Sequence, residues 1–416
     1  MATLQPYKKY NAIAYDYAKQ LPNGWQLLPN IAIFEERIQR GHENEELLSV
    51  TISRGVIKQS DLDKKDSSTL DKSKYLLVYP DDLVYSMRFR QGASGYSNYK
   101  GIVSPACTVL KPRKGIKLNS RYYHYMFRTG FYKNYAERYA YGIADGQMPL
   151  RYFDFKRMYS IVPPLEVQNS IVEYLDKKNS EINKFIRSKE RLIELLEEEK
   201  NSIILKLVTK GISYNQFKES NINWIGEIPV NWKIKRLRFL CKITTGGKNT
   251  EDKIDEGKYP FFVRSQIVER INSYSFDGEA ILTAGDGAGV GKVFHYINGK
   301  FDYHQRVYNF YNFKPVIGLY LFYYIKTNFH NVALMGDAKS TVDSLRLPLI
   351  KDFEISYPER KEEQQEIVTK IESESLKIEN AISKARQEID SIKEYHEALI
   401  TDLVTGKRSI PQLQMA

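Results

Sequence analysis

The chain contains an internal two-fold repeat, and this repeat limits its possible folds more than any other feature of the sequence. Ile171 aligns with Ile367 and Leu207 aligns with Leu403, both at an offset of 196 residues. Self-similarity at such a distance indicates two copies of one structural unit. The interiors of the two copies share little identity, so we expect equivalent frames that carry different surfaces.

Between these anchors, apolar residues recur with a spacing of three and four, as in a coiled coil that continues for about five heptads. The first stripe consists of Val172, Leu175, Ile182, Ile186, Ile193, Leu196, Ile203 and Leu207, and the second of Val368, Ile371, Ile378, Ile382, Ala385, Ile389, Ile392, Leu399 and Leu403. The stripes are interrupted by the polar residues Asn179, Lys189, Lys200, Ser375 and His396. Such positions usually specify register and partner. His396 could also be a ligand or a base, but without a nearby carboxylate or cysteine in the sequence we interpret it as a seam or surface residue.

Each predicted helix has a start signal and a stop signal. Pro163-Pro164 in one copy and Pro358 in the other can end a strand and permit a helix to begin. Gly211 and Gly406 follow the two Leu-Val-Thr segments and are typical of helix C-terminal caps. A helix from Glu166 to Val208 would be about 64 Å long at 1.5 Å per residue.

The predicted fold is α+β, with two mixed α/β domains separated by two long antiparallel coiled-coil helices and related by a pseudo-two-fold axis. Trp25 and Trp232 mark the equivalent start of each domain. The predicted segments are a first domain (1–163), a first helical spacer (164–212), a second domain (213–357) and a second helical spacer (358–416).

The composition favours an anionic partner. Lysine and arginine number 62 against 51 acidic residues, which gives a formal charge of +11, and 31 tyrosines accompany them. This balance suits nucleic acid, although a solvated lysine surface and tyrosines in a core would give the same counts.

The two cysteines, Cys107 and Cys241, stand far apart without a Cys/His cluster, which predicts neither a disulfide nor a zinc site. With neither a signal peptide nor an apolar run long enough for a membrane span, we expect a soluble, cytoplasmic protein.

Three segments, together with the paired helices, resemble the specificity subunits of type I restriction-modification systems. They are Trp224 to Pro229 with Trp232, Gln91 to Ala106, and Gly285 to Val293. The resemblance covers nearly the whole chain. Two departures are Cys107, at a position that is usually aromatic, and a shortened first landmark at Leu21 to Trp25.

This resemblance implies a subunit without catalysis of its own that reads double-stranded DNA at a bipartite, asymmetric site, with one target-recognition domain for each half-site. It also implies that two methyltransferase (modification) subunits dock on the helices and methylate adenine with S-adenosylmethionine that they bind themselves. Two restriction subunits can join the same complex. No cofactor of its own, no metal and no membrane are expected.

Candidate DNA-binding residues combine long hydrogen-bond donors with pliable, glycine-containing loops. Arginine can read guanine and glutamine can read adenine through paired hydrogen bonds, whereas half or more of protein–DNA hydrogen bonds go to phosphate and sugar. The candidates are Arg88, Arg90, Gln91, Ser94, Tyr96 and Lys100 in the first domain, and Arg264, Gln266, Lys292, His304, Gln305 and Arg306 in the second.

The glycine-rich run from Gly285 to Lys292 does not match a nucleotide-binding phosphate loop. That motif requires glycine where Asp286 stands and a hydroxyl where Val293 stands. Two interpretations stay open: a hairpin whose backbone amides and Lys292 approach DNA, and a purely structural turn.

Other functions fit the sequence less well. An adenine methyltransferase would need an Asn/Asp-Pro-Pro-aromatic run, and the chain has only Val162-Pro163-Pro164-Leu165. A metal-dependent nuclease could use Asp81 with Asp154 and Lys156, but such common residues at long spacing occur more often by chance. A scaffold without DNA binding would explain the helices but not the two dissimilar basic domains.

Overall fold

A computed structural model describes the structure of residues 4–13, 15, 17–62, 71–139, 150–329 and 346–410. The chain divides into two compact units, the first comprising Met1–Ser188 with Gln387–Ala416 and the second comprising Lys189–Arg386. Two long helices, α5 (Leu165–Lys210) and α9 (Lys361–Val404), each contribute one end to each unit. Each unit therefore contains one domain together with parts of both helices. This two-way division does not test the four segments predicted from the sequence, which stay a prediction.

The first unit is built from short antiparallel strands covered by helices. A four-stranded sheet has the order β4-β11-β8-β9, and two-stranded sheets are formed by β1 with β2, β3 with β12, β5 with β6 and β7 with β10. The strands are β1 (Tyr10–Ala12), β2 (Gln20–Pro22), β3 (Gln26–Pro29), β4 (Phe34–Glu36), β5 (Leu48–Thr51), β6 (Gly55–Lys58), β7 (Leu76–Val78), β8 (Leu83–Tyr85), β9 (Ser94–Tyr96), β10 (Gly101–Val103), β11 (Thr108–Pro112) and β12 (Tyr159–Val162). The helices are α1 (Asn30–Ile33), η1 (Gln59–Asp61), η2 (Phe89–Gln91), α2 (Ser120–Arg128), α3 (Gly130–Glu137) and α4 (Tyr152–Phe155).

The second unit is organised around one larger sheet. This six-stranded sheet has the order β16-β21-β19-β20-β17-β18, and two-stranded sheets are formed by β13 with β14 and β15 with β22. The strands are β13 (Phe217–Glu219), β14 (Glu227–Pro229), β15 (Lys233–Arg236), β16 (Lys242–Thr245), β17 (Tyr259–Phe262), β18 (Glu269–Ile271), β19 (Phe276–Ala284), β20 (Phe294–Tyr303), β21 (Val307–Tyr311) and β22 (Glu354–Tyr357). The helices are η3 (Leu237–Phe239), η4 (Thr250–Asp252), η5 (Gly287–Gly289), α6 (Gly318–Asn328) and α8 (Leu347–Asp352).

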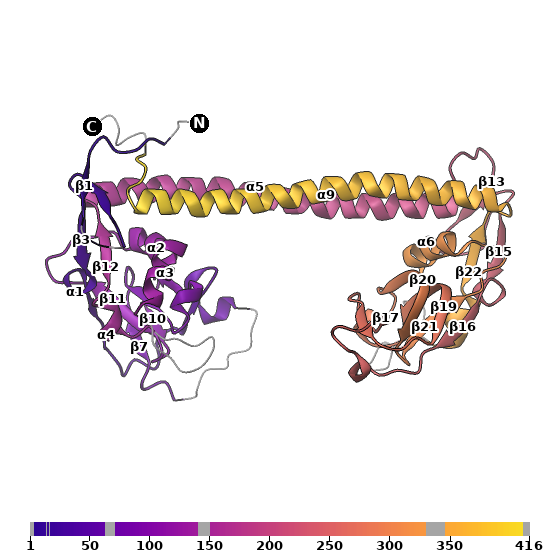
Figure 1. The fold of residues 1–416 in the computed structure, drawn as a ribbon, viewed down its shortest axis with the longest axis horizontal. Helices are drawn as coiled ribbons and strands as arrows, with labels where there is room; N and C mark the ends of the chain where they lie inside the picture. The colour runs from indigo at the N-terminus through magenta and orange to yellow at the C-terminus, as the bar shows by residue number, and fades with distance from the viewer. Residues whose placement is uncertain are drawn as a thin grey trace. The chain divides into compact units, whose positions relative to one another are not determined.

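In each unit the long helices belong to the domain core. In the first unit, Val172 of α5 and Leu403 of α9 join the same buried cluster as Tyr122 of α2. In the second unit, Leu207 of α5 and Val368 of α9 join Tyr320 of α6. Because an early part of one helix meets a late part of the other, the two helices run antiparallel within each unit, as predicted (Figure 1).

The helix starts are held to the domains by a repeated glutamine. Gln168 accepts from the backbone N–H of Asn119 at 2.9 Å and donates to the Pro163 carbonyl at 2.9 Å. Gln364 accepts from the backbone N–H of Ile317 at 2.8 Å and donates to the Pro358 carbonyl at 2.8 Å. Both side chains are buried. The same polar contact therefore fixes the beginning of α5 and of α9.

The helix ends are held by glycine and tryptophan. Gly211 and Gly406 adopt positive φ angles of 73° and 71° after the ends of α5 and α9. A Cβ atom on Gly211 would lie 3.2 Å from the Trp232 ring, and one on Gly406 would lie 3.1 Å from the Trp25 ring. Glycine is thus required both for the left-handed conformation and for close packing of the tryptophan that opens each domain.

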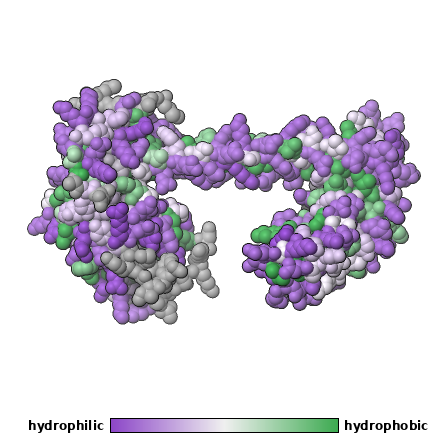
Figure 2. Space-filling view, in the orientation of Figure 1, coloured by the Kyte–Doolittle hydropathy of each residue, from purple (hydrophilic) through white to green (hydrophobic). Residues whose placement is uncertain are grey.

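The predicted coiled-coil stripes agree with the burial of their residues. Val172, Leu175 and Ile182 are buried on α5, and the five polar interruptions, such as Lys189 and His396, are half-buried. Most of the visible surface of the long helices is hydrophilic (Figure 2). Among the described residues, every helix is too short or too polar to cross a membrane.

Candidate nucleic-acid interface

In the second unit, three connections between strands of the six-stranded sheet meet at one place. They follow β17, join β19 to β20 and join β20 to β21, and together they carry all of the predicted second-domain residues. The Gly285 N–H donates to the Arg306 carbonyl at 2.8 Å, which ties the β19–β20 connection to the β20–β21 connection. Residues up to 42 positions apart in sequence, Arg264 and Arg306, are therefore neighbours in this unit.

Asp286 lies at the centre of this cluster. Its Oδ1 accepts from Nη1 of Arg264 at 3.1 Å, and its Oδ2 lies 3.7 Å from Nε of Arg306. The Asp286 side chain is 20% exposed, whereas those of Arg264 and Arg306 are 46% and 65% exposed. Two exposed guanidinium groups are thus held by a single, more sheltered carboxylate.

The glycine-rich run has a packing role around this carboxylate. A Cβ atom on Gly285 would lie 2.9 Å from the Arg306 carbonyl oxygen, and one on Gly289 would lie 2.4 Å from the Arg264 carbonyl oxygen. Only glycine allows the backbone of this connection to approach the backbones that carry both arginines. Lys292, at the end of the run, is exposed.

The other predicted residues of the second unit differ in accessibility. Gln266 and Gln305 are exposed, and Nε2 of Gln305 donates to Oδ1 of Asn249 at 2.5 Å. His304 is buried, and its Nδ1 accepts from the Arg306 N–H at 2.9 Å. Burial, followed by the positive charge of Arg264, lowers the pKa of His304. A neutral ring that accepts at Nδ1 carries its proton on Nε2, so His304 positions the Arg306 backbone.

In the first unit, three predicted residues occupy one short helical turn. Arg88 and Gln91 are exposed at the two ends of η2, and Arg90 lies between them. Nε of Arg90 donates to Oε1 of Glu137 on α3 at 3.1 Å. Gly92, with a φ of 99°, ends the turn and returns the chain toward β9.

Ser94 and Tyr96 lie on β9, which packs against the β5–β6 hairpin. A Cβ atom on Gly95 would lie 2.9 Å from Cα of Gly55, so the two strands cross at glycine. The crossing buries Ser94, whereas Tyr96 is half-buried with the Arg121 guanidinium 5.5 Å from its ring centroid. Contact of the Ser94 side chain with DNA stays a prediction that its burial does not favour.

Arg128 of α2 forms hydrogen bonds with the backbone of the same region. Its Nη1 donates to the carbonyls of Gly92 and Ser94, both at 2.9 Å, and its Nη2 donates to the carbonyl of Ser53 at 3.1 Å. The arginine therefore connects the end of η2, the strand β9 and the β5–β6 hairpin. Lys100 lies on a separate turn before β10, where it is exposed and forms an ion pair with Glu45.

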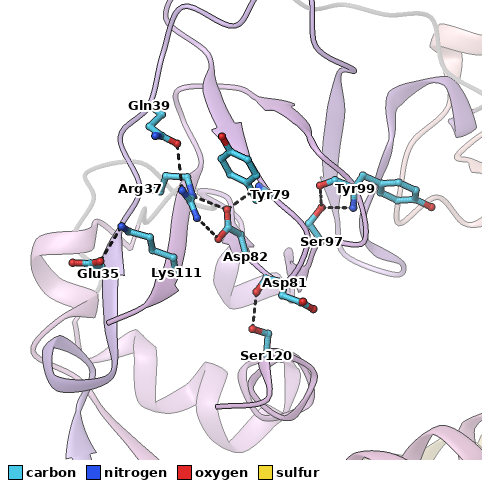
Figure 3. A network of polar contacts seen from close by, with 10 residues as sticks. All are labelled: Glu35, Arg37, Gln39, Tyr79, Asp81, Asp82, Ser97, Tyr99, Lys111 and Ser120. Atoms are coloured by element: carbon cyan, nitrogen blue, oxygen red, sulfur yellow. Dashed lines mark hydrogen bonds and ion pairs between the residues drawn. The ribbon is translucent and has the colours of Figure 1, made fainter. Parts of the chain in front are cut away.

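Asp81, one of the carboxylates considered for a nuclease, lies beside a network of polar contacts around Asp82 (Figure 3). Asp82 accepts from Nε and Nη2 of Arg37 at 2.7 and 3.0 Å and from the Tyr79 N–H at 2.8 Å. The neighbouring Asp81 adopts a φ of 67°, and its carbonyl accepts from the Ser120 hydroxyl at 2.6 Å. Across the part of the chain that the structure describes, no three His, Cys, Asp or Glu side chains gather as a potential metal site.

Two residues that shape these sites were missed by the sequence analysis. Asp286 was noted only because it breaks a phosphate-loop pattern, although it pairs with two predicted residues. Arg128 was not singled out, because nothing in its spacing shows that its guanidinium reaches backbone carbonyls of distant segments. The available signals were the glycine-rich run around Asp286 and the arginines Arg121 and Arg138 on either side of Arg128.

A family model for the "Type I restriction modification DNA specificity domain" matches residues 48–195 and 229–389 of the chain. The chain belongs to this family. The first matched region contains all candidate DNA-binding residues of the first domain, and the second contains all those of the second domain. Each region also extends from its domain into the long helices.

Individual relatives of this specificity-domain protein agree with that assignment. It is 30% identical over 190 residues to the type I restriction enzyme EcoDI specificity subunit of Escherichia coli, a match that covers 44% of this chain and 40% of that relative. The chain therefore matches less than half the length of this curated relative.

Two solved structures share the fold of this specificity-domain protein at low sequence identity. A chain described under "Structural basis underlying complex assembly and conformational transition of the type I R-M system" matches with a TM-score of 0.69 at 13% identity, covering 92% of this chain and 98% of the other. The HsdS subunit from Thermoanaerobacter tengcongensis matches with a TM-score of 0.50 at 14% identity, covering 95% and 99%. The predicted α+β fold with two long helices is confirmed.

Proposed function

We propose that this protein is the sequence-reading subunit of a type I restriction-modification enzyme and that it recognises a bipartite, asymmetric site on double-stranded DNA. Each unit reads one half-site through its own loops. The chain itself carries out no catalysis. It acts in the cytoplasm, where its target DNA lies.

One observation carries this proposal. The two units anchor the long helices in the same way, but they present different clusters of long hydrogen-bond donors. Gln168 and Gln364 make the same contacts at the starts of the two helices, whereas the arginines of η2 in one unit and those beside Asp286 in the other stand on unrelated loops. A repeated frame with unlike reading loops is what an asymmetric two-part site requires, because each half-site needs its own pattern of donors and acceptors.

The long helices are the proposed docking sites for partner subunits. Several large apolar side chains are exposed on them, including Leu195 at 45%, Leu376 at 59% and Tyr395 at 48%. Exposed apolar groups on otherwise hydrophilic helices are typical of protein–protein contacts. Two methyltransferase subunits would bind there and supply S-adenosylmethionine for adenine methylation, and two restriction subunits would complete the nuclease.

The experiment is to co-express the chain with a methyltransferase subunit of the same system and to map modified adenines in the host genome by single-molecule sequencing. The proposal predicts one motif made of two short, different half-sites around a fixed gap. If a verified complex supplied with S-adenosylmethionine yields no such motif, the chain is a scaffold or an inactive specificity subunit.

A further inference from the structure

Asp286 is an acidic side chain at the centre of a basic cluster. Three predicted DNA-binding cations, Arg264, Arg306 and Lys292, belong to the connections that surround it. A carboxylate near a DNA backbone is repelled by the phosphates, and burying it partly adds a cost of desolvation. A surface that only needed affinity for DNA would have no use for this residue.

The contacts of Asp286 point to a positioning role. Its two oxygens engage different arginines, Arg264 through Oδ1 at 3.1 Å and Arg306 through Oδ2 at 3.7 Å. Arginine has many rotamers, and fixing its planar guanidinium before binding reduces the entropy lost when it pairs with a base edge. The side chains of Arg264 and Arg306 are 46% and 65% exposed, respectively, so both remain available for contact with DNA.

The surrounding backbone holds the carboxylate itself in place. Gly285 donates to the Arg306 carbonyl at 2.8 Å, and the close approach of Gly289 to the Arg264 carbonyl leaves no room for a side chain. His304 binds the Arg306 N–H through Nδ1 at 2.9 Å. The distances from Asp286 to its arginines are therefore set by the three connections together.

We propose that Asp286 is a specificity-determining residue of the second unit. It positions Arg264 and Arg306 for the edges of bases and opposes their use as general phosphate contacts. This inference rests on the proposed function, because it assigns a role within the DNA-reading surface of that unit. The first unit has a comparable pair, since Glu137 accepts from Nε of Arg90 at 3.1 Å.

The test compares Asp286→Asn with Asp352→Asn in the full complex with methyltransferase subunits. Asp352 provides a matched control, because its Oδ1 also lies near two arginines of the same unit, at 3.5 Å from Arg236 and 3.0 Å from Arg238. Both variants remove one negative charge and thereby weaken the contacts with two guanidinium groups. Only Asp286 stands among the predicted DNA-binding residues.

For each complex, modified adenines are mapped and binding to target and random duplexes is measured over a range of salt concentrations. In Asp286→Asn we expect the second half-site to become degenerate at one or more positions, with target preference reduced roughly tenfold or more. Random duplex should bind more tightly, with a logarithmic salt slope steeper by about one phosphate contact. Asp352→Asn should keep the wild-type motif and preference.

The outcomes separate this inference from the proposed function. If the wild-type complex has a bipartite motif and Asp286→Asn keeps it unchanged, or changes it no more than Asp352→Asn does, the role of Asp286 is refuted. If Asp286→Asn binds all duplexes more weakly and loses the first half-site too, the residue is structural and the inference is again refuted. A wild-type complex without any motif refutes the proposed function itself.

Discussion

Tyr122 and Tyr320 are fully buried tyrosines whose hydroxyls have equivalent partners at the ends of the long helices. The Tyr122 hydroxyl donates to the Val404 carbonyl at 2.9 Å, and the Tyr320 hydroxyl donates to the Val208 carbonyl at 3.0 Å. The last carbonyls of a helix lack partners within the helix, so a buried one needs a donor from elsewhere. Burial raises the pKa of both tyrosines well above its usual value, and the hydroxyls stay protonated as donors.

Tyr122→Phe should destabilise the first unit, because it leaves the buried Val404 carbonyl without this donor. The expected loss is about 1–2 kcal/mol. In thermal unfolding this corresponds to a Tm lower by roughly 2–4 °C per kcal/mol for a unit of this size. Tyr395→Phe, at a side chain that is 48% exposed, is the control and should leave the Tm unchanged. Equal shifts in both variants would argue against the buried hydrogen bond as the cause.

The two cysteines should be chemically inert in the folded protein. Burial raises the pKa of the half-buried Cys107 and of the buried Cys241 to about 12 each, because the thiolate loses part of its hydration. At pH 8 only about one thiol in ten thousand would then be the reactive thiolate. Ellman's reagent at pH 8 should therefore label neither residue in the native protein and both after unfolding in urea. Rapid labelling before unfolding would show that at least one site is open.

The capping turns after α5 and α9 each require glycine. Gly211→Ala would introduce a Cβ atom 2.8 Å from the Tyr214 ring and 3.2 Å from Trp232. Gly226 also has a positive φ, of 67°, but a Cβ atom there would meet nothing within 4 Å. Both substitutions incur a backbone cost of about 1 kcal/mol, and only Gly211→Ala adds a clash.

We therefore expect Gly211→Ala to lower the free energy of unfolding of the second unit by clearly more than Gly226→Ala does. Denaturant unfolding of the full chain, followed by tryptophan fluorescence, measures the difference. Similar losses in the two variants would mean that the aromatic cover of Gly211 adjusts without cost.

The long helices were the part of the fold that the sequence predicted best. A spacing of three and four repeated over many turns is a strong signal, and the helix expected at Glu166 to Val208 spans Leu165–Lys210 in the structure. The proline and glycine signals lie within three residues of the ends of the observed helices, because such signals act locally.

The candidate sites could be predicted only as groups of residues, not as geometry. The meeting of Arg264 with Arg306 depends on the pairing order of the six-stranded sheet, which arises from contacts between distant segments. Ser94 and His304 were chosen for their donors, but β9 crosses under a hairpin and His304 faces its own turn, so both are buried. Such burial depends on tertiary packing, and a short loop has no periodic hydrophobic pattern from which it could be predicted.

For the molecule as a whole, the central claim is that one chain carries two independent readers of DNA. The two units have equivalent helix anchors, but their loops differ, and each predicted set of residues lies within a single unit. A change in the loops of one unit should therefore affect one half-site and leave the other half-site and the gap unchanged. A protein that merely holds DNA by charge would respond to either change in the same way.

The most direct test maps modified adenines for the complexes that contain Arg90→Ala or Arg306→Ala, beside the wild-type complex. We predict that Arg90→Ala relaxes base preference in one half-site only and that Arg306→Ala relaxes it in the other half-site only, each by about 1–3 kcal/mol at the affected positions. If both variants weaken methylation equally at all sites, or relax the same half-site, the assignment of one half-site to each unit is wrong.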